Sequence, residues 1–322
     1  MKVYIFSILL ISIAQSMVFA QDLSTEIPAH DPVMIKQDSV YYLFTTGRGI
    51  GVWSSMDMHS WKQESRIFDE APDWAVSAVA GFRNHVWAPD ISFYNGKYYL
   101  YYSVSTFGKN TSSIGVATNT TLHPHDPAYK WQDHGQVIAS VPGKTNWNAI
   151  DPNLIIGADG TPYLTFGSFW EGIKLVRLNK DGFSTDEPLD QLKTLAKRRD
   201  TVSGNPIEAP FIFKKEKYYY LFASIDYCCK GASSTYKMIV GRSEKLSGPY
   251  LDAEGNALNT GGGTLILAGN KDWYGVGHNA VCTFDGLDYL VFHGYDANDY
   301  SKAKLIVRQL DWKHGWPVSR NL

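Results

Sequence analysis

Five acidic or imidazole side chains stand where apolar, strand-like segments begin: Asp31, Asp90, Asp151, Glu208 and His278. Polar groups at the inner edge of apolar strands are costly unless they have partners or take part in chemistry. If the five converge, a protonated and an ionised carboxyl group could cleave a glycosidic bond, the first protonating the leaving oxygen and the second activating water or attacking the anomeric carbon. The same side chains could instead hold a metal ion. The residue types alone leave both chemistries open.

The segments that carry these residues are five copies of one pattern. Each copy has a polar opening residue, an apolar strand, a turn containing Gly, Asp, Asn or Lys, and a second strand rich in Tyr and Leu, and a further alternating strand follows. The copies are "HDPVMIKQDSVYYLFTTG", "PDISFYNGKYYLYYSVST", "IDPNLIIGADGTPYLTFGS", "IEAPFIFKKEKYYYLFAS" and "GHNAVCTFDGLDYLVFHG". The opening residues are 59, 61, 57 and 70 positions apart. Five units of similar length therefore fill the chain.

A unit of at least three short antiparallel strands that repeats at a regular interval is typical of a β-propeller blade. We predict an all-β fold, a single five-bladed β-propeller over residues 21–322, with the first strand of each blade nearest the axis. The five opening residues should then surround one mouth of the central channel. The one helix-like stretch, residues 187–199, is short and charged. A β-sandwich with irregular loops would not explain the regular spacing.

Residues 1–20 have the features of a secretory signal peptide. Lys2 precedes an apolar run over residues 3–14, and the small residue Ala20 precedes Gln21. A membrane anchor is the alternative, but the run is shorter than the roughly 20 apolar residues that a span needs. We therefore expect a secreted or periplasmic protein whose mature chain begins after Ala20.

The charge balance and the cysteine content exclude several classes of protein. With 30 Lys and Arg against 32 Asp and Glu, the formal net charge is −2, which argues against a nucleic-acid partner. We expect no membrane partner and a monomer. Three cysteines cannot form a disulfide framework. The adjacent pair, Cys228 and Cys229, could form a vicinal disulfide or remain as two buried thiols, and adjacent thiolates span a zinc tetrahedron poorly.

Six motifs occur in a characteristic order. They are "HDPVM", "HVWAPDI", "WNAIDPNL", "NPIEAPF", "DYCCKGASSTYKMIVGRSEKLSGPY" and "GVGHNAV". Together they resemble glycoside hydrolase family 43, and within it the endo-α-1,5-L-arabinanases. The resemblance covers residues 28–318. The short acidic motifs are shared by several families of five-bladed glycosidases, whereas "CCKGASSTYKMIVGRS" and "WNAIDP" are more specific to arabinanases.

The resemblance implies a hydrolase that cleaves internal α-1,5-L-arabinofuranosidic bonds of arabinan with inversion of configuration. Asp31 matches the general base, Glu208 matches the general acid, and Asp151 matches the carboxylate that orients the acid and raises its pKa. All three are among the blade openers found above. Asp90 has no usual proton-transfer role in the family, and we interpret it as structural or as a distant electrostatic contributor.

The resemblance also suggests ligand-binding residues. Trp87 and Phe107 are candidate aromatic platforms for sugar rings, and Asn148 and Ser168 are candidate hydrogen-bonding partners of arabinose hydroxyls. His278 matches the residue beside an axial ion, often calcium. Since calcium prefers oxygen to imidazole nitrogen, water should supply most of the ligands.

Two kinds of alternative stay open. An exo-acting α-L-arabinofuranosidase or a β-xylosidase of the same fold would use the same chemistry, and the openness of the cleft would separate it from an endo-acting enzyme. A carbohydrate-binding propeller without catalysis belongs to a different class. The presence of Asp31, Asp151 and Glu208 together argues against it.

Overall fold

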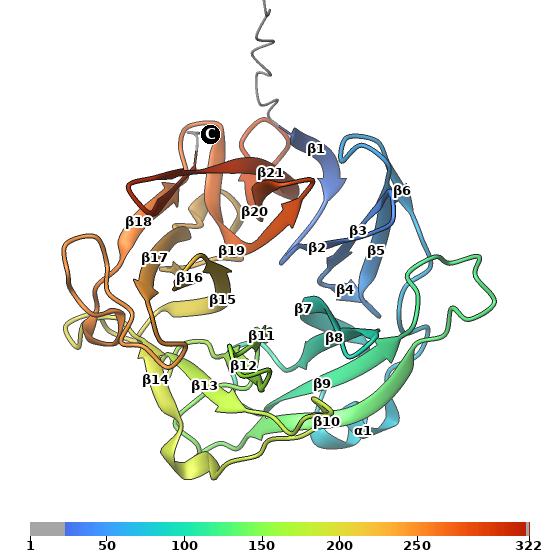
Figure 1. Cartoon of the computed structure of the whole chain (residues 1–322), viewed down its shortest axis with the longest axis horizontal. Helices are drawn as coiled ribbons and strands as arrows, with labels where there is room; N and C mark the ends of the chain where they lie inside the picture. The colour runs from blue at the N-terminus through green and yellow to red at the C-terminus, as the bar shows by residue number, and fades with distance from the viewer. Residues whose placement is uncertain (1–22, 320–321) are drawn as a thin grey trace, which may run out of the picture.

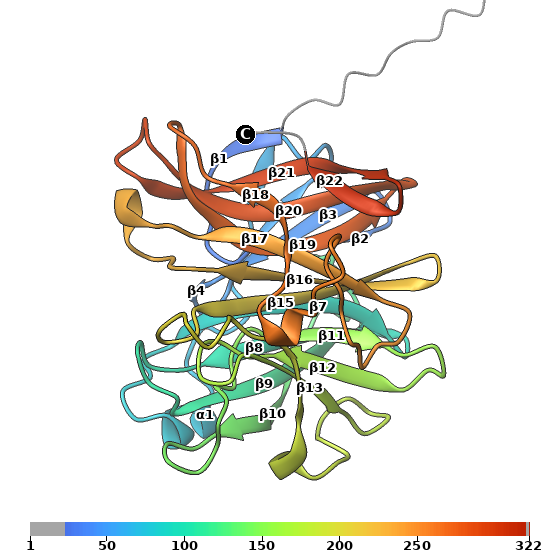
Figure 2. The same ribbon diagram turned by 90° about the vertical axis from the view of Figure 1, so that its left-hand side faces the viewer.

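The computed structural model describes residues 23–319 and 322. The predicted signal peptide lies outside the described residues. The described chain forms five antiparallel sheets arranged in a ring (Figure 1). This arrangement confirms the predicted five-bladed β-propeller. Seen from the side, blade 5 lies above blade 4, and blades 2 and 3 lie below them (Figure 2). None of the helices in the described part of the chain is long and apolar enough to cross a membrane.

Blades 1 to 4 each contain four strands in order from the axis outward, because consecutive strands pair as hairpins. Blade 1 contains β2 (Val33–Gln37), β3 (Val40–Thr45), β5 (Gly51–Ser55) and β6 (Trp61–Gln63). Blade 2 contains β7 (His85–Tyr94), β8 (Lys97–Val104), β9 (Ser112–Asn119) and β10 (Gln132–Ser140), and the short β4 (Gly47–Arg48) pairs with β7. Blade 3 contains β11 (Asn153–Ile156), β12 (Pro162–Phe166), β13 (Ile173–Arg177) and β14 (Lys193–Ala196). Blade 4 contains β15 (Ile207–Lys215), β16 (Tyr218–Ile225), β17 (Lys237–Ser243) and β18 (Thr264–Ala268).

Blade 5 closes the ring with strands from both ends of the described chain. It contains β19 (Trp273–Phe284), β20 (Leu287–Asp296), β21 (Lys302–Lys313) and, beside β21, both β22 (Trp316–Ser319) and β1 (Leu23–Pro28). Because β1 precedes the first blade and pairs antiparallel with the last, it holds the two ends of the ring together. Lys304 of β21 supports this closure through ion pairs with Glu26 at 2.6 Å and Asp296 at 2.9 Å.

The apolar core is divided into five clusters, each between two neighbouring blades. Strand β3 shows how one strand serves two of them. Tyr42 and Phe44 pack toward blade 2, and Tyr41 and Leu43 pack toward blade 5. Successive side chains of a strand point to opposite faces, so a strand buried on both faces has a continuous apolar run. The Tyr- and Leu-rich second strands of the repeat have this composition for that reason.

The helical content differs from the prediction. The helix-like stretch over residues 187–199 is a single 3-10 turn, Leu189–Gln191, followed by β14. The α-helix of the described chain is instead α1 (Asp73–Ala78), in the connection between β6 and β7. Two further 3-10 turns occupy Gly231–Ser233 and Leu258–Thr260. Pairing with β13 outweighs the weak helix propensity of the charged segment.

Candidate active site

The residue that opens each blade has left-handed backbone geometry. The five residues, with their φ angles, are Asp31 (51°), Ala88 (44°), Asp151 (57°), Ala209 (53°) and His278 (52°). Four of them precede a proline, which disfavours the right-handed helical region for the preceding residue. Left-handed geometry is uncommon outside glycine, and its repetition here identifies the equivalent position in all five blades.

The structure corrects the predicted equivalence of the five chemical side chains. Asp31, Asp151 and His278 occupy the opening position, but Ala88 and Ala209 occupy it in blades 2 and 4. Glu208 therefore lies one residue before the equivalent position, and Asp90 lies two residues after it. The repeat located the correct segments, and the left-handed geometry, which the sequence pattern does not show, fixes the true register.

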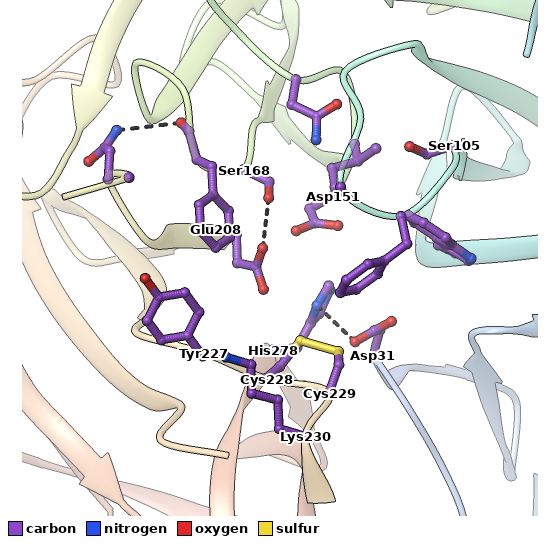
Figure 3. A pocket seen from close by; sticks show the side chains of 18 of the residues that line it. Asp31, Ser105, Asp151, Ser168, Glu208, Tyr227, Cys228, Cys229, Lys230 and His278 are labelled. Carbon is purple, nitrogen blue, oxygen red and sulfur yellow. Dashed lines mark hydrogen bonds and ion pairs between the residues drawn. A yellow bond between two sulfur atoms is a disulfide. The ribbon is translucent and has the colours of Figure 1, made fainter. Parts of the chain in front are cut away.

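Asp31, Asp151, Glu208 and His278 line one cavity of about 1800 Å³. Its wall draws residues from all five blades, so the side chains that converge here are far apart in the sequence. Figure 3 shows the three carboxylates around a common space, with His278 directed at Asp31. The predicted convergence of the five opening residues is therefore confirmed for these four side chains and is wrong for Asp90, which is absent from the cavity wall.

Asp31 is held as a carboxylate. Its Oδ1 lies 3.0 Å from His278 Nδ1, and its Oδ2 accepts a 2.5 Å hydrogen bond from the Thr46 hydroxyl. Burial alone would raise the pKa of Asp31, but the charges and hydrogen bonds of His278 and His30 outweigh it and hold the pKa well below the usual range. An ionised carboxylate at this position can accept a proton from water.

The pKa of Glu208 is shifted in the opposite direction from that of Asp31. Its Oε2 accepts a 2.7 Å hydrogen bond from the Ser168 hydroxyl. Burial raises the pKa of Glu208 and outweighs this hydrogen bond. Burial likewise raises the pKa of Asp151, with the charge of Glu208 adding to the increase and His278 opposing it. Because the two groups titrate together, the pair keeps a proton at a pH where an exposed carboxyl group has lost it. A proton donor therefore faces an ionised acceptor.

Asp90 lies outside the cavity lining and serves the fold. It is buried and accepts hydrogen bonds from Asn153 Nδ2 at 3.0 Å and from the Leu154 backbone N–H at 2.8 Å. Burial raises its pKa to about 6, and these two hydrogen bonds limit the increase. Asp90 thus attaches the first strand of blade 3 to blade 2, in agreement with the structural interpretation.

The four predicted substrate-binding residues all line the cavity. Phe107 is 77% exposed, and Trp87 donates its indole N–H to His85 Nδ1 at 2.8 Å. Asn148 is buried, and its Oδ1 accepts a hydrogen bond from Ser112 at 2.6 Å. Ser168 donates to Glu208, so it acts on the acid as well as facing the cavity.

The adjacent cysteines form a vicinal disulfide, which resolves the two readings left open by the sequence. Both lie in the cavity wall beside Tyr227 and Lys230 (Figure 3). The backbone N–H of Cys229 donates to the Tyr295 hydroxyl at 2.8 Å, and that hydroxyl contacts His30 Nε2 at 3.1 Å. The loop that carries the disulfide is thereby tied to the residue next to Asp31.

Sequence reasoning missed a set of polar residues beneath the site. They are Thr46, Ser103, Ser224 and His293, which lie in or just after the second strands of their blades and accept hydrogen bonds from the backbone N–H groups of the opening residues. Their signal is present in four of the five copies of the repeat, where a polar residue stands at this position of the Tyr- and Leu-rich segment, whereas the third copy has Gly167 there. Without the register of the strands, that residue reads as an ordinary turn residue.

The side chains near His278 do not fit a calcium ion held directly by the protein. Calcium takes about six to eight oxygen ligands. The described residues contain one group of three suitable side chains close enough to share an ion: His30, Asp31 and His293, two imidazoles and one carboxylate. His293 Nδ1 already accepts the Asp31 backbone N–H at 3.1 Å, and His278 Nδ1 faces Asp31. An axial ion would need water for its oxygen ligands, and no catalytic step below depends on one.

Comparison with known proteins gives three informative matches. The chain is 48% identical over 299 residues to the extracellular exo-α-(1→5)-L-arabinofuranosidase ArbA of Cellvibrio japonicus, with 91% of this chain and 86% of that protein covered. It is 44% identical over 292 residues to the extracellular endo-α-(1→5)-L-arabinanase 1 of Bacillus subtilis, with 89% and 86% covered. The structure of Cellvibrio cellulosa α-L-arabinanase complexed with arabinohexaose matches with a TM-score of 0.87 and 47% identity, covering 91% of this chain and 96% of that one.

A family model agrees with these matches. The model that describes glycosyl hydrolases family 43 matches residues 25–317, which include strands of all five blades and every residue of the cavity wall. The order of the motifs, the five-bladed fold and the converging carboxylates lead to the same assignment. The chain belongs to glycosyl hydrolases family 43 and is a glycoside hydrolase of the arabinanase type.

Proposed function

We propose that the protein hydrolyses the α-1,5-L-arabinofuranosidic bonds of arabinan with inversion, and that it cleaves internal bonds. The proposal rests on one observation: the pKa values of two carboxyl groups in the same cavity are shifted in opposite directions. Asp31 has a depressed pKa and Glu208 a raised one. Environments that separate the pKa values of two acids assign the base and the acid of a hydrolase.

The reaction follows from these protonation states. Asp31 accepts a proton from a water molecule as the water oxygen forms its bond to the anomeric carbon. The bond from that carbon to O5 of the next arabinose breaks, and Glu208 gives its proton to the departing oxygen. Attack from the face opposite the leaving group converts the α-configuration to β. Asp151 orients Glu208, and because the two carboxyl groups titrate together, the pair retains the proton that the departing oxygen receives.

The cavity suits a neutral oligosaccharide. Its volume of about 1800 Å³ exceeds what a single furanose ring needs, so several sugar units can bind across the acid and the base. Arabinofuranose carries no charge, and its affinity should come from hydroxyl hydrogen bonds and aromatic faces. Trp87 and Phe107 supply such faces in the cavity wall, and Asn148 supplies a polar group.

Exo action on the same linkage is the second candidate. Two similar proteins favour it by name: the 48% identical exo-α-(1→5)-L-arabinofuranosidase, and a solved exo-1,5-α-L-arabinanase from a bovine ruminal metagenomic library, which is 50% identical with a TM-score of 0.88 and covers 91% of this chain and 97% of that one. The endo-acting relative is 44% identical, so sequence similarity alone separates the two modes poorly. The chemistry at Asp31 and Glu208 is the same in both.

Incubation with debranched linear arabinan and sizing of the products tests the proposal. Internal cleavage gives oligosaccharides of mixed length early, and the viscosity falls before much reducing sugar appears. A single short product from the first minutes would instead support exo action. Faster cleavage of an aryl β-xyloside than of arabinan would contradict the substrate assignment.

Three further expectations belong to this proposal. The relatives named above are extracellular by name, which supports secretion directed by residues 1–20. We propose that a mainly water-coordinated calcium ion near His278 adds to stability. We also propose that the protein acts as a monomer.

A further inference from the structure

Each left-handed opening residue is held by the neighbouring blade through its backbone N–H group. The acceptor atoms differ in chemistry, but four of them belong to side chains in or just after a second strand. The hydrogen bonds are Ala88 N–H to Thr46 Oγ1 (2.7 Å), Asp151 N–H to Ser103 Oγ (3.0 Å), His278 N–H to Ser224 Oγ (2.9 Å) and Asp31 N–H to His293 Nδ1 (3.1 Å). Together they link the blades around the axis.

The four acceptors occupy one equivalent position. Ser103, Ser224 and His293 each pair with the residue that precedes the left-handed residue of their own blade: Trp87, Glu208 and Gly277. The backbone N–H of Thr46 donates to the carbonyl oxygen of His30 in the same way. The pattern is therefore a property of the repeat.

Blade 3 is the exception, and the exception involves a catalytic carboxylate. Its equivalent residue is Gly167, whose N–H donates to the Ile150 carbonyl oxygen but which has no side chain to accept. A Cβ atom there would lie 2.5 Å from the Gly172 carbonyl oxygen, and the φ angle of 129° also favours glycine. The Ala209 N–H donates instead to Asp151 Oδ2 at 3.1 Å. The Asp151 carboxylate thus accepts the hydrogen bond that a side chain at position 167 would otherwise accept.

Two of these hydrogen bonds form a chain that runs from Ser103 to the residue beside Glu208, the proposed general acid. Ser103 in blade 2 holds the backbone of Asp151 in blade 3, and the Asp151 carboxylate holds Ala209 in blade 4. Ala209 follows Glu208 directly in the chain. We propose that Ser103 is a positioning residue for the reaction, because it fixes Asp151 and through it the place of Glu208. This inference rests on the proposed function for the reaction that it serves.

Ser103 acts without touching the substrate. It is fully buried and is absent from the cavity wall. Loss of its hydroxyl would leave the buried Asp151 N–H without its acceptor, and the backbone would shift to recover a partner. A displacement of about 1 Å at a catalytic group can lower the rate about 100-fold.

The test compares two substrates with Ser103→Ala. Arabinotetraose needs Glu208 to protonate its leaving oxygen, whereas a 4-nitrophenyl α-1,5-arabinotrioside releases a nitrophenolate that needs little protonation. General acid catalysis contributes about 10²–10⁴-fold, so we expect kcat on arabinotetraose to fall about 10-fold or more with KM nearly unchanged. The aryl substrate should lose less than about threefold. Equal losses on both substrates, or an unchanged kcat on arabinotetraose, would overturn the proposal.

Ser55→Ala is the matched control. Ser55 is also a buried serine that accepts a backbone N–H, from Met58 at 2.9 Å, and it lies outside the cavity wall. Ser55→Ala should keep its activity on both arabinotetraose and the aryl substrate, even if its melting temperature falls. A selective loss on arabinotetraose in Ser55→Ala would overturn the assignment to Ser103. If Ser103→Ala does not fold, Ser103→Cys replaces it, because cysteine has a similar size but is a weaker hydrogen-bond acceptor. The loss of kcat on arabinotetraose is then compared in the same way with the loss on the aryl substrate. Wild-type protein that hydrolyses neither substrate would instead refute the proposed function.

Discussion

His278 Nδ1 lies 3.0 Å from Asp31 Oδ1, and this ion pair joins the fifth blade to the first at the predicted general base. Burial opposes the charge of His278, but the Asp31 carboxylate outweighs it and raises the pKa of His278 to about 9. The same contact lowers the pKa of Asp31. The imidazole therefore acts on the base directly, beyond any effect on an axial ion.

Asp31→Asn and Glu208→Gln should each lower kcat on arabinan by about 10²–10⁴-fold, because each removes one proton transfer while keeping the side-chain shape. Initial rates on linear arabinan measure this loss. Asp90→Asn is the matched carboxylate outside the cavity wall, and it should keep most of the turnover while its melting temperature falls. Near wild-type turnover in either catalytic variant would disprove its role.

The alkaline limb of the pH profile should follow Glu208. Its raised pKa keeps the acid protonated at a higher pH than usual, and kcat/KM should fall as the pH rises through that pKa. The Ser168 hydroxyl donates to the carboxylate and lowers this pKa. Ser168→Ala should therefore move the alkaline limb to higher pH.

Ser105→Ala serves as the control for that shift. Ser105 also lines the cavity, but its hydroxyl pairs with Ser112 at 2.7 Å. Profiles of kcat/KM for both variants on one oligosaccharide give the comparison. A limb that stays in place in Ser168→Ala, or moves equally in Ser105→Ala, would remove Glu208 from the role of acid.

The vicinal disulfide should contribute to substrate binding. Both sulfur-bearing residues lie in the cavity wall, and the Cys229 backbone is tied to Tyr295. The double variant Cys228→Ser/Cys229→Ser should raise KM for arabino-oligosaccharides more than it lowers kcat. Cys282→Ala, which removes the free thiol outside the cavity wall, should leave KM unchanged. The same KM in all three proteins would show that the disulfide has no part in binding.

Removal of a bound calcium ion should lower the melting temperature, because a ligand that binds the folded state stabilises it. We expect EDTA to lower the melting temperature of the wild-type protein and added calcium to restore it. His278→Gln should respond less to both treatments. Thermal melting that is unaffected by EDTA and calcium would contradict the predicted ion.

The sequence was sufficient for the architecture and for the segments of the site. The repeat predicted five blades because each blade is one hairpin-based unit, and strands buried on both faces leave a continuous apolar signature. The repeat also led to Asp31, Asp151 and Glu208, and the motifs assigned their separate roles. Neither source revealed that Ala88 and Ala209 occupy the equivalent positions in blades 2 and 4. Left-handed geometry depends on bulges and on contacts between blades, which a local pattern does not contain.

The chain of hydrogen bonds from Ser103 to the backbone beside Glu208 could not be predicted from local sequence patterns either. Its hydrogen bonds join residues 48 and 58 positions apart. A buried serine at the end of a strand becomes informative only when its acceptor role and the glycine in the equivalent position of blade 3 are seen together. The vicinal disulfide is similar, since the sequence left oxidised and reduced forms equally open until the two cysteines were placed in the cavity wall.

Proton NMR of the first product tests the central claim most directly. Wild-type protein is mixed with α-1,5-arabinotetraose, and the anomeric signals are followed before mutarotation equilibrates them. Inverting hydrolysis by Asp31 and Glu208 predicts that the new reducing end appears first as the β-anomer. The α-anomer as the first product would mean a retaining mechanism, and no hydrolysis of this substrate would contradict the proposed activity itself.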